Sequence, residues 1–249
     1  MTLRTLWTLK TIMSGHSKWA NIKRKKGAND KIKANVFAKM SHLITISVLE
    51  GGGIAEPENN VKLRLAIDKA KSVNMPKENI RRAIERGFGP NKMMLKEVIY
   101  EGFGPYGIFL LILSTTDSSN RTTAEIRNFL EKNSGKLGSQ GSVSYLFNKC
   151  AFVSFQKSEV NEEAVFKIGE ELQAFDINED ESHFFVFFPF SNFGLLKTHL
   201  NNIKYDLAEI DYLPTTPVKL DPDKEKKVLD IIEALEDLDD IQRVYSNLG

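Results

Sequence analysis

Apolar residues recur with a helical period in three stretches of the first third of the chain. From Val36 to Val48 they fall every three or four positions, and glycines 51–53 end this pattern. Pro57 fits the first turn of a second helix. The apolar positions of that helix are Val61, Leu65, Ala66, Ala70 and Val73, with Leu63 and Ile67 widening the stripe. A third helix starts at Pro76, has Ile80, Ala83 and Ile84 on its inner side, and ends at Gly87. The pattern predicts a three-helix bundle.

Strand patterns follow the third helix. Lys96–Glu101 alternates, and Ile108–Leu113 is a continuous apolar run. Thr122 and Glu125 have the spacing of a capping box, which predicts a helix with Ile126, Phe129 and Leu130 inward and Gly135 at its end. Val143–Phe147 is expected to be the third strand. A further unit is expected to contain strands at Ala151–Phe155, Phe184–Phe188 and Leu207–Tyr212 and helices at Glu162–Phe175 and near Asn192–Asn201.

The last helix and strand, expected at Pro222–Leu238 and Ile241–Tyr245, have no partners of their own. They would complete the sheet that begins at Lys96. We therefore expect an α+β protein, an N-terminal three-helix bundle followed by two α/β domains, the last one inserted into the middle one. The expected boundaries are an extension at 1–12, a basic helical domain at 13–92, an α/β domain at 93–147 plus 214–249, and an inserted α/β domain at 148–213.

Residues 1–12 hold Arg4 and Lys10 and no acid, which is the composition of a short organellar transit segment. The alternative is that translation starts at Met13 and this extension is a misassigned start. We expect a cytoplasmic protein, or one of the mitochondrial matrix if the segment is a genuine transit peptide.

Composition excludes several classes of protein. The chain has 249 residues, 27% charged and 41% hydrophobic, which is ordinary for a globular protein. Its longest apolar run, Ile108–Leu113, is far shorter than the roughly 20 residues of a membrane-spanning helix. A single cysteine, Cys150, rules out an intramolecular disulfide framework. No membrane partner is expected.

Charge is divided unevenly along the chain although the net charge is only +1. Residues 1–100 hold 20 Lys and Arg against 8 Asp and Glu, or +12, whereas residues 101–249 hold 14 against 25, or −11. Such asymmetry is typical of a protein whose basic end meets a polyanion.

The candidate nucleic-acid-binding residues lie mainly in the basic end. Lys23, Arg24, Lys25 and Lys26 are adjacent and repel one another unless phosphates meet them. Trp19 beside them either stacks on an unpaired base or anchors the segment against the bundle. On the third helix the basic residues either contact a polyanion or form a solvated face. The full set is His16, Ser17, Lys18, Trp19, Lys23, Arg24, Lys25, Lys26, Lys31, Lys33, Lys39, Arg64, Lys77, Arg81, Arg82 and Arg86.

Catalytic constellations are not apparent, so we expect no enzyme, no cofactor, no metal and no small-molecule substrate. The four histidines lack metal-ligand spacing. Gly102–Gly107 reads G-x-G-x-x-G, but a strand rather than a helix follows it, which favours a hairpin turn over a dinucleotide site.

The motifs together resemble the YebC/PmpR family, which includes the mitochondrial translational activator of cytochrome c oxidase subunit one. The most specific match is the string from Gly15 to Lys23, directly after a Met and a Ser. The other matches are Gly52-Gly53, Leu63-Arg64 with Ala66–Ala70, Asn74–Lys77, Ile80 with Arg82–Ile84, Tyr100–Gly102, Gly104-Pro105, Thr116-Asp117, Asn120–Thr122, Glu125 with Arg127, and Gly141–Val143. The chain departs from the family at Ala34-Asn35 and Ser118-Ser119.

The resemblance implies a three-domain, non-enzymatic regulator of gene expression, described in most members as a DNA-binding transcriptional regulator. Some members are associated instead with the ribosome, so the resemblance also implies an alternative, a factor that binds the ribosome and its rRNA and promotes synthesis through proline-rich stalls. Lysines outnumber arginines in the basic segment, which favours backbone contacts and structured RNA over base readout in duplex DNA. A second alternative is a protein-interaction module that acts through the acidic domains.

Overall fold

The computed structural model describes residues 30–88, 94–196 and 203–249, with side chains from Val36 onward. Within these ranges the chain forms two compact units, one of 30–146 and 216–248 and the other of 147–215. The expected α+β class, with helices at the N-terminus and a last domain inserted into the middle one, is confirmed. Each sheet is antiparallel and has four strands.

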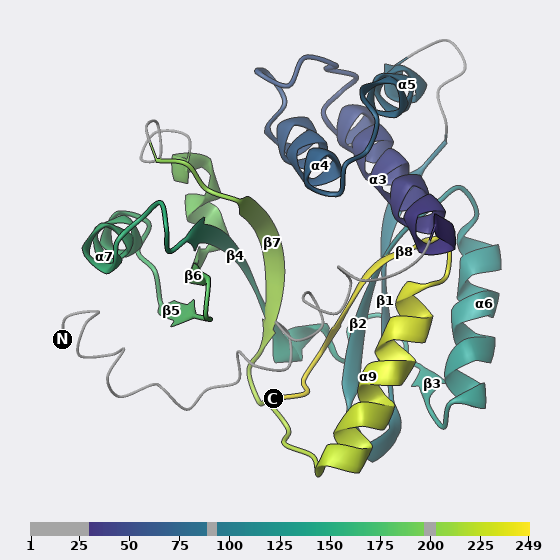
Figure 1. Cartoon of the computed structure of the whole chain (residues 1–249). Helices are drawn as coiled ribbons and strands as arrows, with labels where there is room; N and C mark the ends of the chain where they lie inside the picture. The colour runs from purple at the N-terminus through teal and green to yellow at the C-terminus, as the bar shows by residue number, and fades with distance from the viewer. Residues whose placement is uncertain (1–29, 89–93, 197–202) are drawn as a thin grey trace. The chain divides into compact units, whose positions relative to one another are not determined.

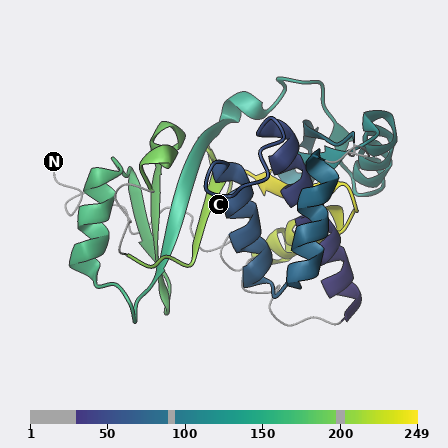
Figure 2. The same cartoon turned by 90° about the horizontal axis from the view of Figure 1, so that it is seen from above.

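The first part of the larger unit is a helical bundle of α3 (Asp30–Glu50), α4 (Val61–Ser72) and α5 (Lys77–Phe88). Figures 1 and 2 show the three helices side by side. As expected, the stripe on α3 faces the core, where Met40, Ile44 and Val48 are buried and Val36, Phe37 and Leu43 pack against them. Burial of these apolar side chains provides the main stabilisation of the bundle.

Two details of the second helix were wrong. The helix begins at Val61 rather than in the turn at Pro57, because Asn60 is its N-cap and accepts a hydrogen bond from the Leu63 amide. The buried positions Leu63, Ala66, Ile67 and Ala70 all belong to the expected stripe, and Val73 packs against the core, but Val61 is exposed. The capping residue sets where the helix starts, whereas the apolar period sets which face meets the core.

The third helix runs through Gly87 to Phe88, so the expected termination at Gly87 was also wrong. Gly87 is buried against α3 instead, where the space beside Val48 has no room for a side chain. A glycine in this pattern therefore marks close approach of two helices rather than a helix end.

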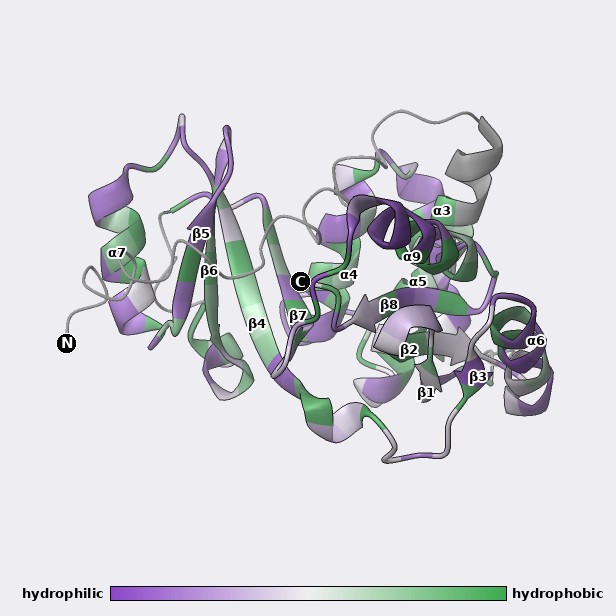
Figure 3. Cartoon of the chain, turned by 90° about the horizontal axis from the view of Figure 1, so that it is seen from below, coloured by the Kyte–Doolittle hydropathy of each residue, from purple (hydrophilic) through white to green (hydrophobic). Residues whose placement is uncertain are grey.

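The second part of the larger unit is a sheet of order β3-β1-β2-β8. The strands are β1 (Lys96–Phe103), β2 (Phe109–Thr116), β3 (Lys136–Leu137) and β8 (Ile241–Ser246). The helices α6 (Ser119–Lys132) and α9 (Pro222–Glu236) pack on it through Ile126, Leu130, Val228, Ile232 and Leu235. Both carry hydrophilic residues on their exposed sides in Figure 3. The late helix and strand complete this sheet, as the sequence predicted, with β8 beside β2.

The segment Gly102–Gly107 forms a hairpin turn, as expected. β1 pairs with β2 as far as Phe103 and Phe109, and the three-residue helix η2 (Pro105–Gly107) joins them. The strand β2, rather than a helix, opens after these glycines, so their backbone lacks the context of a dinucleotide site.

Two expectations for residues 116–147 were wrong. Thr122 lies within α6, whose N-cap is Ser118, and its hydroxyl donates to Asp240 rather than capping the helix. The segment expected as a third strand forms a turn and the short helix η3 (Ser144–Leu146) instead. Backbone amides of Gly141, Val143 and Ser144 in this segment donate to the buried carboxylate of Glu101. Burial alone raises the pKa of Glu101, but these donors outweigh it and hold the pKa below its ordinary value.

The smaller unit is a sheet of order β5-β6-β4-β7 with one helix against it (Figure 1). Its elements are β4 (Phe147–Gln156), α7 (Glu162–Glu171), β5 (Asp176–Glu179), β6 (His183–Pro189), η4 (Phe190–Leu195) and β7 (Leu207–Pro214). β5 was missed, because the polar sequence at 176–179 carries little strand signal, and the expected helix at 162–175 ends four residues early. The helix expected near 192–201 begins as η4, and residues 197–202 lie outside the described ranges.

Candidate nucleic-acid interface

The bundle places its basic residues outside because its apolar stripes are turned inward. On α4 the buried positions are Leu63, Ala66, Ile67 and Ala70, so every charged residue of that helix lies on the remaining sides. Together α4 and α5 hold eight Lys and Arg against three Asp and Glu, or +5. This positive surface belongs to helices whose positions are fixed by a shared core.

The loop before α4 is held by buried Asn60. Its side-chain amide donates to the carbonyl groups of Ser47 at 2.9 Å and Ile54 at 3.0 Å. A side chain at Gly51 would collide with this amide, since a Cβ there would lie 2.3 Å from Nδ2. Asn60 thus joins the end of α3 to the start of α4 and fixes the orientation of the basic helix.

Arginines on α5 are engaged by acids of the same helix. Arg81 lies 2.7 Å from Glu78 and is also paired with Glu85, while Arg82 lies 3.3 Å from Glu78. The hydrogen bond from Arg81 lowers the pKa of Glu78. These pairs are exposed, so they are weak and a phosphate can replace the carboxylate at little cost. The cations of this helix are therefore partly neutralised by acids of the same helix.

Three of the predicted cations on α4 and α5, namely Arg64, Lys77 and Arg86, have no ion-pair partner among the described residues. Arg64 on α4 is half-buried, and Lys77 at the start of α5 is exposed. By contrast, Lys62 pairs with Glu50 at 2.6 Å, and Lys71 lies 3.6 Å from Asp68. Arg64, Lys77 and Arg86 could meet a phosphate without first leaving a carboxylate.

The other predicted residues either contact groups elsewhere in the larger unit or lie outside the residues that the structure describes. Lys39 donates from its ammonium group to the carbonyl oxygen of Glu236, and Arg86 donates to Ser41 Oγ at 3.3 Å. Lys39 therefore ties α3 to the end of α9. The residues outside the described ranges are His16, Ser17, Lys18, Trp19, Lys23, Arg24, Lys25 and Lys26, and the side chains of Lys31 and Lys33 are likewise outside them.

Three basic residues of α4 were missed by the sequence reasoning, namely Lys62, Lys69 and Lys71. The seven-residue spacing places Lys71 on the same flank of α4 as Arg64, and Lys69 on the same flank as Lys62, with the buried stripe between the two flanks. The signal that would have found them is the apolar stripe itself, since positions 63, 66, 67 and 70 leave every cation of this helix outside the core.

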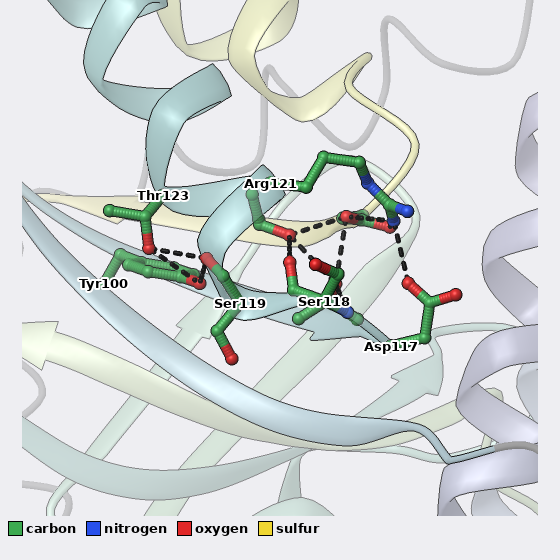
Figure 4. A network of polar contacts seen from close by, with 9 residues as sticks. Tyr100, Asp117, Ser118, Ser119, Arg121 and Thr123 are labelled. Carbon is green, nitrogen blue, oxygen red and sulfur yellow. Dashed lines mark hydrogen bonds and ion pairs between the residues drawn. The ribbon is translucent and has the colours of Figure 1, made fainter.

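A polar network fixes the start of α6 to the start of β8 (Figure 4). Asp240 accepts hydrogen bonds from Thr122 Oγ1 at 2.6 Å, Thr116 Oγ1 at 3.1 Å and Arg121 Nη2 at 2.9 Å. Burial raises the pKa of Asp240, but these three donors outweigh burial and hold the pKa below its ordinary value. Arg121 also pairs with Asp117 at 3.0 Å. This loop is therefore internally satisfied, which argues for a structural role.

A groove of about 820 Å³ lies beside this network in the same unit. Its lining is His42, Arg121, Glu125, Asn128, Phe129, Lys132, Leu238, Asp239 and Asp240. Burial lowers the pKa of His42, and attraction by Asp240 offsets this only in part. His42 is then neutral at pH 7 and adds nothing to the positive surface of the bundle.

Metal-ligand clusters and membrane-spanning helices are both absent from the parts of the chain that the structure describes. No three His, Cys, Asp or Glu side chains in those ranges are grouped as metal ligands. Within the same ranges, no helix has the length and apolar character needed to cross a membrane.

Comparison with known proteins places this fold in a family. The family described as "TACO1/YebC protein N-terminal domain" matches residues 17–90, and "TACO1/YebC second and third domain" matches residues 95–248. A relative from Caldanaerobacter subterraneus subsp. tengcongensis, named a probable transcriptional regulatory protein, is 42% identical over 240 residues, covering 95% of this chain and 98% of the relative. One of the same name from Nitrosococcus oceani is 45% identical over 241 residues, covering 94% and 95%.

A solved structure shares the architecture. The crystal structure of a conserved hypothetical protein from Aquifex aeolicus superposes with a TM-score of 0.78 at 35% identity, covering 88% of this chain and 91% of that one. The family match spans the helical domain and both sheet domains, and the relatives are similar over nearly their full length. This chain belongs to the TACO1/YebC family.

Proposed function

We propose that this protein is a non-enzymatic regulator of gene expression that binds nucleic acid through its helical domain. The observation that carries the proposal is the charge of the bundle's outer surface, where α4 and α5 hold eight cations against three acids. The basic segment Lys23–Lys26 precedes the same domain in sequence. Phosphates would neutralise both, and counterion release would supply affinity without reading the bases. The names of the relatives agree with a regulator.

The proposal includes two kinds of nucleic acid as targets, duplex DNA and structured RNA. The relatives are named probable transcriptional regulators, which favours duplex DNA. The predominance of lysine over arginine in the segment Lys23–Lys26 favours RNA, because bidentate arginine contacts to guanine are the commonest specific readout of a DNA major groove. The alternative function is thus a factor that binds structured RNA, including the ribosome.

Equilibrium binding across a salt series tests this. The full chain would be titrated with ribosomes, with a structured RNA hairpin and with promoter-containing duplex DNA. Two variants would be compared with it, Lys23/Arg24/Lys25/Lys26→Ala and Arg64/Lys77→Ala. The matched control is Lys157/Lys204→Ala, which removes two cations from the smaller unit.

The proposal expects both bundle variants to bind more weakly and with a shallower dependence of log K on log salt. The slope should fall by about 0.7–0.9 for each phosphate that a variant no longer neutralises. The control should leave the slope unchanged. Equal weakening in control and bundle variants would contradict the proposal, because net charge rather than the bundle surface would then determine affinity, and unchanged behaviour of the bundle variants would favour a protein-interaction module. Salt-resistant preference for one duplex over a scrambled one selects the DNA target, and tight ribosome binding at physiological salt selects RNA.

A further inference from the structure

An exposed tyrosine occupies a strained backbone position at the tip of the β1–β2 hairpin. Tyr106 has φ 61° and ψ 27°, in the left-handed region, and is followed by Gly107 at φ 76°. L-residues with a Cβ are disfavoured there, and a large aromatic side chain is an outlier. Glycine would be free of this strain. Tyr106 therefore sits where folding alone favours a residue without a side chain.

Neighbouring contacts impose this conformation. The Gly104 amide donates to the Ile108 carbonyl at 2.7 Å, and the Phe109 amide donates to Asn247 Oδ1 at 2.7 Å. Asn247 is fully buried, and its amide nitrogen lies 3.5 Å from the Gly107 carbonyl. Hydrogen bonds on both sides of Tyr106 hold the backbone of the hairpin tip, so the ring projects from a rigid turn.

Burial of the Tyr106 ring does little to offset the backbone strain. The residue is 41% exposed, at the end of the sheet where α9 begins. Two ammonium groups lie near the ring, with Lys224 Nζ at 5.7 Å and Lys227 Nζ at 5.9 Å from its centroid. Lys224 also pairs with Asp221 at 2.6 Å, whereas Lys227 has no ion-pair partner among the described residues. An exposed aromatic ring and two cations, one of them outside any ion pair, thus meet at one rigid point.

We propose that the hairpin tip binds an unpaired nucleobase of single-stranded nucleic acid. The base would stack on Tyr106, and Lys227, with Lys224 beside it, would meet the phosphate next to that base. Ring and cation together provide the two contacts that sequence-tolerant binding of single strands requires. Strain held at an exposed aromatic residue is the kind of outlier from which function is inferred. The hairpin tip would add a second contact surface to the proposed function, on the sheet domain rather than the bundle.

A purely structural role for Tyr106 is the competing explanation. Tyr106 could serve only to hold the first turn of α9 through the two lysines. The two explanations differ in what a glycine at this position would do. If the ring holds α9, its loss destabilises the protein. If the ring is a stacking platform, its loss relieves strain and weakens binding of single strands alone.

The experiment uses the full chain and fluorescein-labelled probes, namely a ten-nucleotide uridine RNA, the matching thymidine DNA and a blunt duplex. Tyr106→Gly should raise the midpoint of thermal unfolding and weaken binding of the single strands at least about fivefold, with duplex binding within about twofold of wild type. Tyr106→Phe keeps the ring and should stay within about twofold on every probe. Lys227→Ala should reduce the salt slope for the single strands by about 0.7.

Single-strand binding that is unchanged in Tyr106→Gly, or lost equally in Tyr106→Phe, overturns the inference. The RNA and DNA arms decide whether the 2′-hydroxyl contributes. The Lys23/Arg24/Lys25/Lys26→Ala variant separates the two proposals. If it loses binding while Tyr106→Gly does not, the proposed function stands and the hairpin site falls. If Tyr106→Gly alone loses single-strand binding, the hairpin site stands and the bundle proposal falls. A wild-type chain that binds no probe refutes both.

Discussion

Gly87 of α5 lies directly against Val48 of α3, so closely that a Cβ added to the glycine would be 2.5 Å from the valine Cβ. The same added carbon would lie 3.0 Å from the backbone oxygen of Thr45. Thr45 in turn donates from its hydroxyl to the Ala83 carbonyl at 2.8 Å. Contact between α3 and α5 therefore depends on a missing side chain and on one buried hydrogen bond. The bundle that carries the positive surface is held together at this point.

Replacing Gly87 with alanine should destabilise the bundle. Overpacking costs about 1–3 kcal/mol, and the better helix propensity of alanine returns about 1 kcal/mol. Because one of the colliding atoms is backbone, we expect the free energy of unfolding to fall by about 1–2 kcal/mol. Urea unfolding followed by circular dichroism measures this. Gly194→Ala is the control, since nothing lies within 4 Å of its added carbon, and equal destabilisation in the two variants would show that the close approach is unimportant.

Asp240→Asn should weaken the junction between α6 and β8. The substitution removes the charge that Arg121 faces and disturbs the acceptor shared by Thr116 and Thr122. We expect a decrease of about 1–3 kcal/mol in the free energy of unfolding. Asp117→Asn is the matched control, because its pair with Arg121 is exposed and worth at most about 1 kcal/mol. A larger decrease in Asp117→Asn than in Asp240→Asn would contradict the network described above.

Acid should destabilise the larger unit through Glu101 and Asp240. Both carboxyl groups have a pKa below the ordinary value in the folded protein, so the unfolded chain binds more protons as the pH falls. The stabilisation is complete above the ordinary carboxyl pKa of about 4 and is lost as the pH falls through the folded pKa. Glu101→Gln should be less stable at pH 7 and should lose less stability between pH 7 and pH 3.

Urea unfolding at a series of pH values tests the Glu101 prediction. The control Glu131→Gln alters an exposed glutamate of α6 and should give a curve parallel to wild type. If the free energy of unfolding of Glu101→Gln changed with pH in parallel with wild type, the prediction would be wrong. The three backbone amides would then stabilise the ionised carboxylate no more than a neutral acceptor.

Glu78→Gln should strengthen nucleic-acid binding. The substitution releases Arg81 and Arg82 from their shared acid, so more cations of α5 can meet phosphates. We expect tighter binding and a steeper dependence of log K on log salt, with a change in stability of less than about 1 kcal/mol. Fluorescence anisotropy at several salt concentrations measures the affinity and its salt dependence.

Glu159→Gln is the matched control for that variant, because it releases Lys204 from a similar exposed pair in the smaller unit. Equal gains in the two variants would mean that net charge, rather than the surface of α5, determines affinity. A gain confined to Glu78→Gln would support the bundle as the contact surface.

Much of the fold was determined by local sequence. The apolar period of residues 36–48 predicted the inner face of α3, and the alternation at Lys96–Glu101 predicted β1. The isolated late helix and strand were correctly expected to complete the first sheet, because a lone amphipathic pair must bury its apolar side against something. The uneven distribution of charge and the family motifs also came from sequence alone.

Tertiary structure decided what depends on contacts between distant residues. Thr122 looked like a helix cap, but its hydroxyl reaches Asp240, 118 positions further along the chain. Gly87 looked like a helix end, but the proximity of Val48 explains it. Sequence periodicity indicates which residues face inward. Hydrogen bonds between distant residues, close packing of helices and the strained backbone at Tyr106 arise only when the fold brings distant segments into contact.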